Sequence, residues 1–247
     1  MIEVKLWGRL GNQMFQYATM RTIAEAKGYS FCVEGRKWLG HELFDLDLGQ
    51  PGGVVLTHQY KETIYQYDPR IWDIQDGTYI VGFFQSEKYF NNDKAREWFK
   101  LMPDNAAELI LKQYPVDEYC YINLRGTDVK ELGVQKLPLA YYQEAIEHML
   151  NIKPNLKFIV ITDDAPYGHE YFPYYPIMSN SVKTDFTLLN RAKYVILANS
   201  SFAWWAAWLN LDNYVIAPQG WLDVSKDRSV KKEFSPKDIK VDRFIWI

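Results

Sequence analysis

The pattern of apolar and polar positions predicts a chain in which strands alternate with helices. Short apolar runs end at Gly, Pro or polar residues, and several are followed by apolar residues at helical spacing. The strands expected from these runs cover residues 4–7, 29–33, 79–84, 119–124, 156–161, 194–198 and 214–217, with a final packed strand at 244–247. The expected helices follow residue 12 and end at Gly28, open at Pro138, and cover residues 202–209. This order is typical of α/β folds with parallel sheets.

The same rhythm divides the chain into two parts. A strand, loop, helix and strand open the first part, and the second repeats strand and helix more regularly. A polar, helix-like stretch at residues 103–115 separates them. We therefore expect two Rossmann-like α/β domains, residues 1–115 and 116–247, that face each other across a cleft.

Composition and charge narrow the class of protein. The chain has 247 residues, of which 48% are hydrophobic and 24% charged, values close to those of soluble globular proteins. A net charge of −3 gives no basic footprint for a nucleic acid, so we expect no such partner. Only two cysteines occur, Cys32 and Cys120, and no run of about 18 apolar residues is present. These features predict a cytoplasmic, soluble protein.

Polar residues follow three of the predicted strands of the second part. Arg125 comes directly after one strand, Asp163 and Asp164 after the next, and Ser200 and Ser201 after a third. Open parallel sheets place their ligand sites at such strand ends. An arginine grips phosphate oxygens with two donors, and the start of a helix at the serines offers free N–H groups to an anion. The alternatives are a salt bridge from Arg125 to Asp128, and helix capping by a serine or an aspartate.

Other kinds of site find little support in the sequence. The glycine spacing of Gly8-x-x-Gly11 is not that of a dinucleotide fingerprint, and no Gly-Lys-Ser phosphate loop occurs. Asp45 and Asp47 resemble a metal-binding pair, but they alternate with apolar residues at positions 43–48, which favours a half-exposed strand. The four histidines lack ligand spacing. We therefore expect neither a metal nor a cofactor.

Aromatic residues are unusually abundant, at 16% of the chain. Trp204, Trp205 and Trp208 fall within a predicted helix at spacings that place at least two of them in the core. The segment Tyr171–Pro176 cannot form a regular helix, and its rings either line a sugar-binding surface or hold a loop in place. The rings of the first domain remain open to the same two interpretations.

Four longer motifs, taken together, resemble the α-1,2-fucosyltransferases of glycosyltransferase family 11. They are Gly8-Arg-Leu-Gly-Asn-Gln-Met-Phe-Gln-Tyr-Ala18, Gly82-Phe-Phe-Gln-Ser-Glu-Lys-Tyr-Phe90, Ile161-Thr-Asp-Asp164 and Ala198-Asn-Ser-Ser-Phe-Ala-Trp-Trp-Ala-Ala-Trp-Leu209. They occur in the family's order and extend over nearly the whole chain. The resemblance implies two Rossmann-like domains in a GT-B-like arrangement, with the acceptor side in the first domain. It also implies that the second domain binds GDP-fucose.

The resemblance also implies roles for particular residues. Arg125 matches an arginine that binds the donor's β-phosphate, while Ser200, Ser201 and Phe202 match a loop on the other side of the pyrophosphate. Asp163 or Asp164 matches a guanosine-binding acid, and Gly11, Asn12 and Gln13 match an N-terminal loop that faces the reaction centre. The implied reaction is a metal-independent, inverting transfer of L-fucose to a sugar hydroxyl, expected to be the 2-hydroxyl of a galactoside. Asp128 and Glu131 are candidates for the base that accepts the hydroxyl proton.

The chain departs from the family at the signature His-x-Arg-Arg-x-Asp. Asn123 stands at the His position and Gly126 at the second Arg position, which leaves Asn-Leu-Arg-Gly-Thr-Asp. Two alternatives follow: a transferase of another nucleotide-activated sugar, and a catalytically silent carbohydrate-binding protein. The basic tail from Asp223 to Arg243 precedes an apolar end, which suggests either a peripheral membrane contact or a solvated segment before a packed strand.

Overall fold

The computed structural model describes residues 1–51, 56–127, 137–221 and 237–247 as two compact α/β units. The first unit holds residues 1–102 together with the described residues 237–241, and the second begins at Pro103 and ends with residues 242–247. The expected boundary near residue 115 therefore falls at the end of a helix that groups with the second unit.

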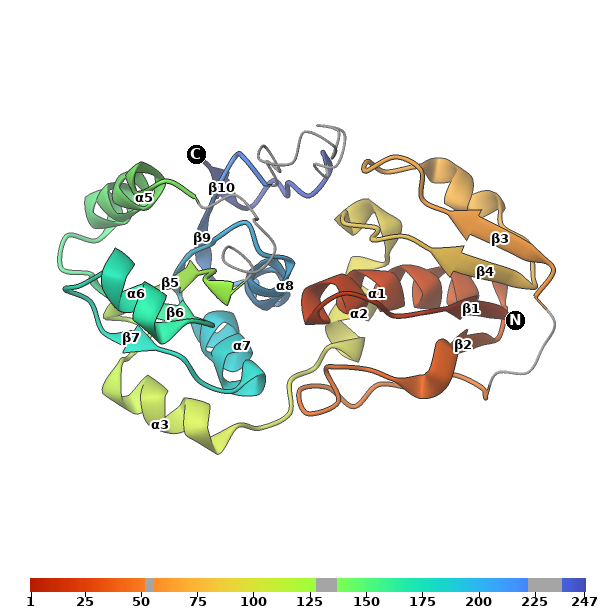
Figure 1. Cartoon of the computed structure of the whole chain (residues 1–247), viewed down its shortest axis with the longest axis horizontal. Coiled ribbons are helices and arrows are strands. Elements are labelled where there is room, and N and C mark those ends of the chain that lie inside the picture. Colours follow the sequence, from red (N-terminus) through yellow and green to blue (C-terminus); the bar gives the residue numbers. More distant parts are fainter. Residues whose placement is uncertain (52–55, 128–136, 222–236) are drawn as a thin grey trace. The chain divides into compact units, whose positions relative to one another are not determined.

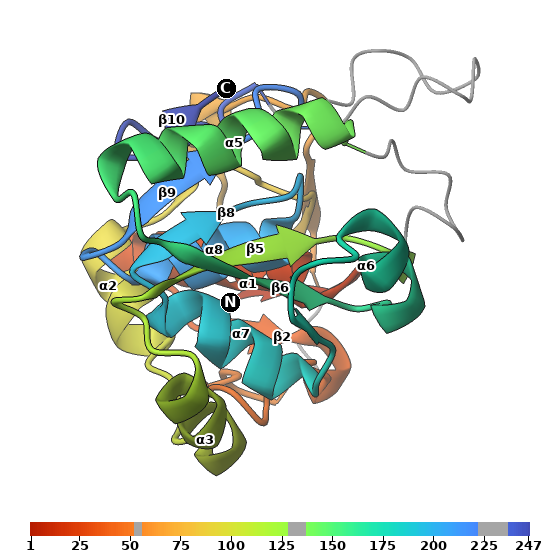
Figure 2. The same cartoon turned by 90° about the vertical axis from the view of Figure 1, so that its left-hand side faces the viewer.

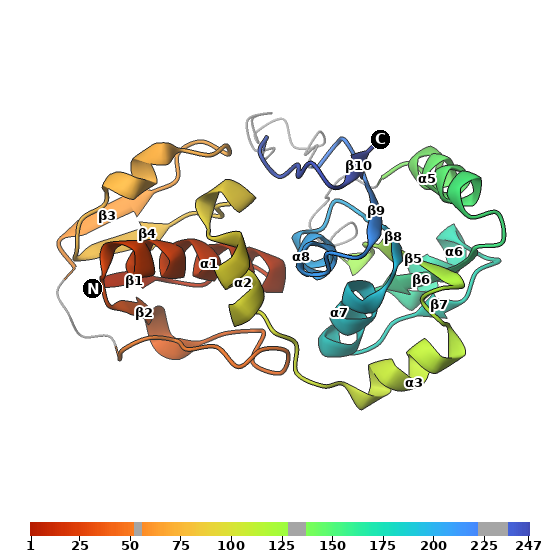
Figure 3. The same ribbon diagram turned by 180° about the vertical axis from the view of Figure 1, so that it is seen from behind.

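The first unit contains one four-stranded, parallel sheet in the order β2-β1-β4-β3. Its elements are β1 (Ile2–Val4), α1 (Leu10–Lys27), β2 (Phe31–Val33), η1 (Glu34–Arg36), β3 (His58–Lys61), η2 (Pro69–Asp73), β4 (Thr78–Val81), η3 (Glu87–Tyr89) and α2 (Asn92–Trp98). Helix α1 packs along β1 (Figure 3) and ends where expected, because Gly28 adopts a left-handed φ of 67°.

A cluster of aromatic rings forms the core of the first unit beside α1. Tyr17, Trp38, Phe44 and Phe99 are buried and pack against one another with ring centroids 5.3 to 6.4 Å apart. The expected strand at residues 43–48 is wrong. Leu43 and Phe44 donate their N–H groups to the oxygen of Gly40 in a turn, and residues 45–48 belong to no strand of the sheet. Exposure nevertheless alternates from Phe44 to Leu48, which is the pattern that suggested a strand.

The second unit contains a six-stranded, parallel sheet in the order β10-β9-β8-β5-β6-β7. Its elements are α3 (Asn105–Gln113), β5 (Tyr119–Leu124), α5 (Leu139–Ile152), β6 (Lys157–Thr162), α6 (Ala165–Tyr171), β7 (Ile177–Met178), α7 (Val182–Arg191), β8 (Tyr194–Ile196), α8 (Ser201–Leu209), β9 (Tyr214–Ala217) and β10 (Ile245–Trp246). Helices α5 and α7 lie on opposite sides of the strands (Figure 2), which explains the continuous apolar runs of β5, β6 and β8. The predicted parallel α/β architecture is confirmed in both units.

Many aromatic residues of the second unit belong to its core. Trp204, Trp205 and Trp208 are all fully buried, as the helical spacing predicted. Tyr171 and Phe172 pack edge-on against the buried Tyr142, with ring centroids 5.9 and 5.3 Å away. Tyr171 and Phe172 therefore hold this loop against the core of the unit, whereas the ring of Tyr174 is exposed.

Candidate functional site

The predicted site residues of the second unit gather at one edge of its sheet. Strand β5 lies in the middle, and the chain runs from β5 to β6 on one side and later returns to β8 on the other side. Because all three strands are parallel, their carboxyl ends meet at the same edge, and the point where the strand order reverses leaves a crevice for ligands. The segments after β5, β6 and β8 carry Arg125, Asp163 and Ser200, respectively.

Arg125 joins two of these segments directly. Its Nη1 donates to the main-chain oxygen of Asn199 over 2.9 Å, which ties the end of β5 to the loop after β8. Because Asn199 is itself buried, its main-chain oxygen offers Arg125 a well-packed partner. The guanidinium is thereby fixed between β5 and β8, at the reversal of strand order.

Asp163 organises the turn that follows Arg125. Its Oδ1 accepts the N–H groups of Gly126 and Thr127 over 2.7 and 3.2 Å. A Cβ atom on Gly126 would lie only 2.5 Å from the Cβ of Asp164. The glycine is thus required by the close approach of the two strand ends, which explains why a second arginine does not stand here.

Two more polar residues belong to this edge: Asp164 follows the end of β6, and Asn123 lies opposite Ile161 near the end of β5. Asp164 caps α6 by accepting the N–H of Tyr167 over 3.0 Å, so the capping alternative applies to this residue. Asn123, at the family's His position, is buried at 7% exposure. Its Oδ1 has no hydrogen-bond partner in the described part of the chain. A buried acceptor without a donor is costly unless a ligand supplies one.

The start of α8 is the third predicted part of the site, after the segments that follow β5 and β6. Ser200 is the N-cap and accepts the N–H of Ala203 over 3.5 Å, and Ser201 is the first helical residue. Phe202 packs edge-on against Phe186, with ring centroids 5.2 Å apart. The helix N-terminus therefore presents its positive end at the edge where Arg125 lies.

Asp185 on α7 is a site candidate that the sequence pattern did not reveal. Only 7% exposed, it accepts hydrogen bonds from the N–H and Nδ2 of Asn180. Burial raises the pKa of its carboxyl to about 6, and the nearby negative charge of Asp163 acts in the same direction. A buried, titratable carboxylate beside a strand-end cluster is a typical property of functional sites.

Three further predictions concern residues outside the described part of the chain. Asp128 and Glu131, the candidates for the base, both belong to the segment 128–136. The salt bridge from Arg125 to Asp128 and the tail residues 222–236 likewise lie outside them, whereas the end of the chain forms β10, paired with β9.

The predicted N-terminal loop residues form the start of α1. Gly11 and Gln13 are buried, and the amide of Gln13 holds the main chain at Leu39 and Gly8 over 3.0 and 3.4 Å. Asn12 is half-buried, and its Oδ1 accepts a hydrogen bond from Gln85 over 2.7 Å. Among these three, Asn12 reaches the carboxyl edge of the first sheet.

Metal ligands are not gathered anywhere in the described ranges. No three His, Cys, Asp or Glu side chains there are arranged to hold an ion. Asp47, one of the pair weighed as a metal site, instead accepts the N–H of Gly49 over 2.8 Å.

A membrane-spanning helix is also not found among the described residues, where no helix is long and apolar enough to cross a bilayer.

The chain is similar in sequence to known sugar transferases. The model of glycosyl transferase family 11 matches residues 138–237. An Escherichia coli α-1,2-colitosyltransferase is 28% identical, over 90% of this chain and 92% of its own length. The E. coli O-antigen biosynthesis glycosyltransferase WbnK is 34% identical over 34% of this chain and 31% of its own.

Solved structures share the fold at low sequence identity. Fucosyltransferase NodZ from Bradyrhizobium superposes with a TM-score of 0.54 at 15% identity, covering 90% of this chain and 97% of its own. POFUT1 in complex with GDP reaches 0.56 at 11% identity, covering 87% and 97%. This likeness shows a GT-B-like fold.

The chain is therefore an α/β enzyme of the glycosyltransferase class. Within that class it is related to glycosyl transferase family 11, as its four motifs predicted.

Proposed function

We propose that this protein transfers L-fucose from GDP-fucose to the 2-hydroxyl of a galactoside, with inversion and without a metal ion. The observation that carries the proposal is the placement of Arg125 and the α8 N-terminus at the strand reversal of the second sheet. Two independent sources of positive charge there suit the pyrophosphate of a nucleotide sugar.

The chemistry follows from where charge develops. The bond between the sugar's anomeric carbon and the β-phosphate oxygen breaks, and the electron pair leaves with GDP. Arg125 is held by Asn199, and the positive end of α8 is fixed by its Ser200 N-cap, so both stabilise this growing charge without reorganising. The N–H of Ser200 itself already donates to the main-chain oxygen of Ala198 over 2.8 Å. The acceptor oxygen forms the new bond from the opposite side and gives its proton to a base, for which Asp128 and Glu131 remain candidates.

The nucleotide part of the donor would supply a hydrogen-bond partner to a polar group at this edge of the sheet that lacks one. The Oδ1 of Asn123 is buried and unpaired within the described residues, so it is available to a hydroxyl or amino group. We propose that Asn123 takes over a donor contact from the family's histidine. Asp163 supports the turn beneath Arg125, which makes its contribution to guanosine binding indirect.

A second donor is favoured by one relative. The similarity to an α-1,2-colitosyltransferase extends over nearly both chains. Colitose is L-fucose without its 3-hydroxyl, so the same linkage and a similar sugar face would be used. Competition between GDP-fucose and GDP-colitose in one reaction, followed by mass spectrometry of the product, decides between the two donors.

Replacing Arg125 by alanine tests the site. We expect Arg125→Ala to lower kcat/KM for the GDP-sugar by about 100-fold or more, since it removes a charged donor from the transition state. A panel of GDP- and UDP-sugars is assayed for hydrolysis and transfer with wild type, this variant and Arg191→Ala, whose arginine pairs with exposed Glu108. Near-wild-type turnover by folded Arg125→Ala contradicts the assignment, and sugar binding without GDP protection supports the silent carbohydrate-binding alternative.

Metal independence has its own test. Excess EDTA is expected to leave the transfer rate unchanged, because Arg125 and the helix N-terminus supply the charge that an ion would bring. Loss of activity that Mn²⁺ restores refutes this part of the proposal.

We also propose that the protein acts in the cytoplasm, where both of its buried cysteines would stay reduced.

A further inference from the structure

The first sheet has the same kind of strand reversal as the second. The chain passes from β1 to β2 on one side and later places β4 on the other side of β1, with β3 at the edge. The loops after β1, β3 and β4 therefore meet at the carboxyl edge, where such folds bind ligands. These loops carry Trp7, Glu62 and Phe83, respectively.

Three aromatic rings lie together at this edge. The ring centroids of Trp7 and Phe83 are 4.0 Å apart, and those of Phe83 and Tyr65 are 6.4 Å apart. Trp7 is 39% exposed, unlike the core rings beside α1. The fully buried Gln16 fixes its position by bonding both the N–H and the oxygen of Trp7 over 2.9 and 3.2 Å. A row of accessible, positioned rings is suited to the apolar face of a sugar.

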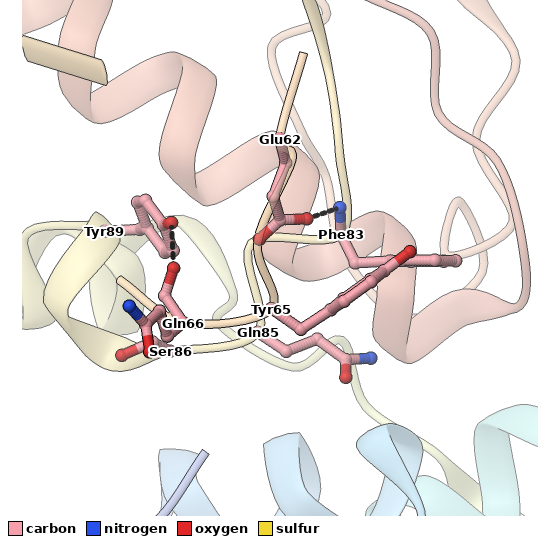
Figure 4. Close-up of a pocket in the computed structure, with 7 residues that line it drawn as sticks. All are labelled: Glu62, Tyr65, Gln66, Phe83, Gln85, Ser86 and Tyr89. Carbon is pink, nitrogen blue, oxygen red and sulfur yellow. Dashed lines mark hydrogen bonds between the residues drawn. The ribbon is translucent and has the colours of Figure 1, made fainter. Parts of the chain in front are cut away.

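A carboxylate lies beside these rings in a small pocket. Glu62 lines it with Tyr65, Phe83 and Gln85 (Figure 4). Its Oε2 accepts the N–H groups of Phe83 and Phe84 over 2.7 and 3.2 Å. In the described part of the chain no group donates to Oε1. One oxygen therefore holds the loop, and the other is available to a ligand.

The backbone is shaped to bring Glu62 to this place. A Cβ on Gly82 would lie 2.6 Å from the Cβ of Glu62, so only glycine permits the approach. Phe84 has a left-handed φ of 53°, an uncommon conformation for a bulky residue. Strain of this kind persists where surrounding contacts enforce it, often at ligand sites. Burial also raises the pKa of Glu62, the direction expected for a proton acceptor.

We infer that this edge binds the acceptor sugar of the proposed reaction, with Trp7, Phe83 and Tyr65 against the apolar face of a pyranose. Glu62 Oε1 accepts a hydrogen bond from one of its hydroxyls, and Gln85, itself bonded to Asn12, borders the same pocket. Pockets that combine apolar rings with a few placed polar groups are typical of small-molecule sites. The inference rests on the proposed function, because it supplies that reaction with an acceptor.

Direct binding of simple glycosides tests the inference without a donor. Saturation-transfer NMR is recorded with the methyl β-glycosides of galactose, glucose and N-acetylglucosamine. Wild type is expected to bind the galactoside, and Glu62→Gln to bind it about tenfold more weakly, since a charged acceptor is lost while a loop-holding oxygen remains. Glu25→Gln is the matched control, because Glu25 pairs with Arg21 on α1.

The aromatic row is tested by Phe83→Ala and by Tyr65→Ala. The second variant serves if the first does not fold, because Tyr65 is half-buried and lies next to Phe83 in the row. Both are expected to weaken glycoside binding, whereas Tyr174→Ala, which removes a ring exposed at 94%, leaves it unchanged. Binding at the wild-type level by folded variants overturns the inference, as does wild type that binds none of the three glycosides.

A second readout separates this inference from the donor assignment. GDP protection against thermal unfolding and acceptor-free hydrolysis of the GDP-sugar are expected to stay at the wild-type level in Glu62→Gln. In transfer assays the KM for the acceptor rises instead. Absent GDP protection in wild type would refute the donor assignment alone, because glycoside binding is measured without nucleotide. If hydrolysis and acceptor transfer fall equally in Glu62→Gln, the residue does not act on the acceptor.

Discussion

At position 126, the neighbouring side chains leave room only for glycine. The strand ends that carry Arg125 and Asp163 approach so closely that a Cβ on Gly126 would meet Asp164 at 2.5 Å. Within the same turn, the carboxylate of Asp163 accepts hydrogen bonds from the N–H groups of Gly126 and Thr127. The missing second arginine of the signature is therefore coupled to this carboxylate turn.

Gly126→Ala is expected to lower the free energy of unfolding by about 1–3 kcal/mol, since overpacking forces the neighbouring atoms apart. Because the displaced turn carries Arg125, the affinity for GDP should fall as well. Urea denaturation gives the first quantity, and calorimetric titration with GDP the second.

Gly220→Ala provides the control for this substitution. A Cβ there has no neighbour within 4 Å, so neither stability nor affinity should change. Equal behaviour of the two variants would mean that the turn relaxes freely, and the explanation for the missing arginine would be wrong.

At the scale of elements, α7 is unusual because polar residues occupy much of its buried face. Thr184, Asp185 and Thr187 are all buried there. Burying a carboxylate costs free energy unless hydrogen bonds or an opposite charge compensate it. Among the described residues, the Asp185 carboxylate accepts hydrogen bonds from Asn180. Its raised pKa couples folding to pH.

The folded state holds the Asp185 proton up to a pKa of about 6, above the ordinary value of 3.8. Stability is therefore greatest below the lower value and falls as pH rises from about 4 to about 6. Asp185→Asn should lack this fall and gain about 2–3 kcal/mol at pH 7 relative to wild type. Urea denaturation between pH 4 and 8 measures both curves, with the exposed Asp212→Asn as control. Parallel curves for wild type and Asp185→Asn would contradict this linkage.

Elements with continuous apolar runs were predictable from the sequence, whereas those with mixed faces were not. Strands β5 and β9 have the expected bounds, since a strand covered on both sides is apolar throughout. Strand β3, His58-Gln-Tyr-Lys61, is an exposed edge strand without an apolar pattern, and α7 hides polar residues inside. Both missed elements lead to site candidates, Glu62 and Asp185. Periodicity misses β3 because an exposed edge strand needs no apolar face, and it misses α7 because polar residues share its buried face.

At the scale of the whole molecule, each unit has its own sheet, its own core and its own strand reversal. Positive groups gather at the reversal of the second sheet, and rings with a carboxylate at that of the first. This difference in chemistry agrees with a division of labour between donor and acceptor. It was predictable for the second sheet, where the residues stand next to apolar strands, but not for the first.

Residues 237–241, which precede the last strand β10, belong to the first unit and support its pocket. The N–H of Lys237 donates to the oxygen of Tyr65 over 3.0 Å, and Asp238 accepts the N–H of Tyr67 over 2.8 Å. Ile239 is 1% exposed. These contacts secure the segment that carries one of the pocket rings, so the stability of the first unit depends on residues far away in the sequence.

Ile239→Ala should therefore destabilise the first unit selectively, by about 2–5 kcal/mol, since a fully buried side chain is truncated. Hydrogen exchange followed by mass spectrometry is expected to accelerate in peptides from residues 1–102 and to stay unchanged in peptides from 103–221. GDP protection should persist while glycoside binding weakens, because only the acceptor pocket loses support. Leu211→Ala, which truncates a side chain exposed at 62% in the second unit, should change neither. Equal acceleration in both sets of peptides would show that the units unfold as one, and the independence of their two sites would then have to be abandoned.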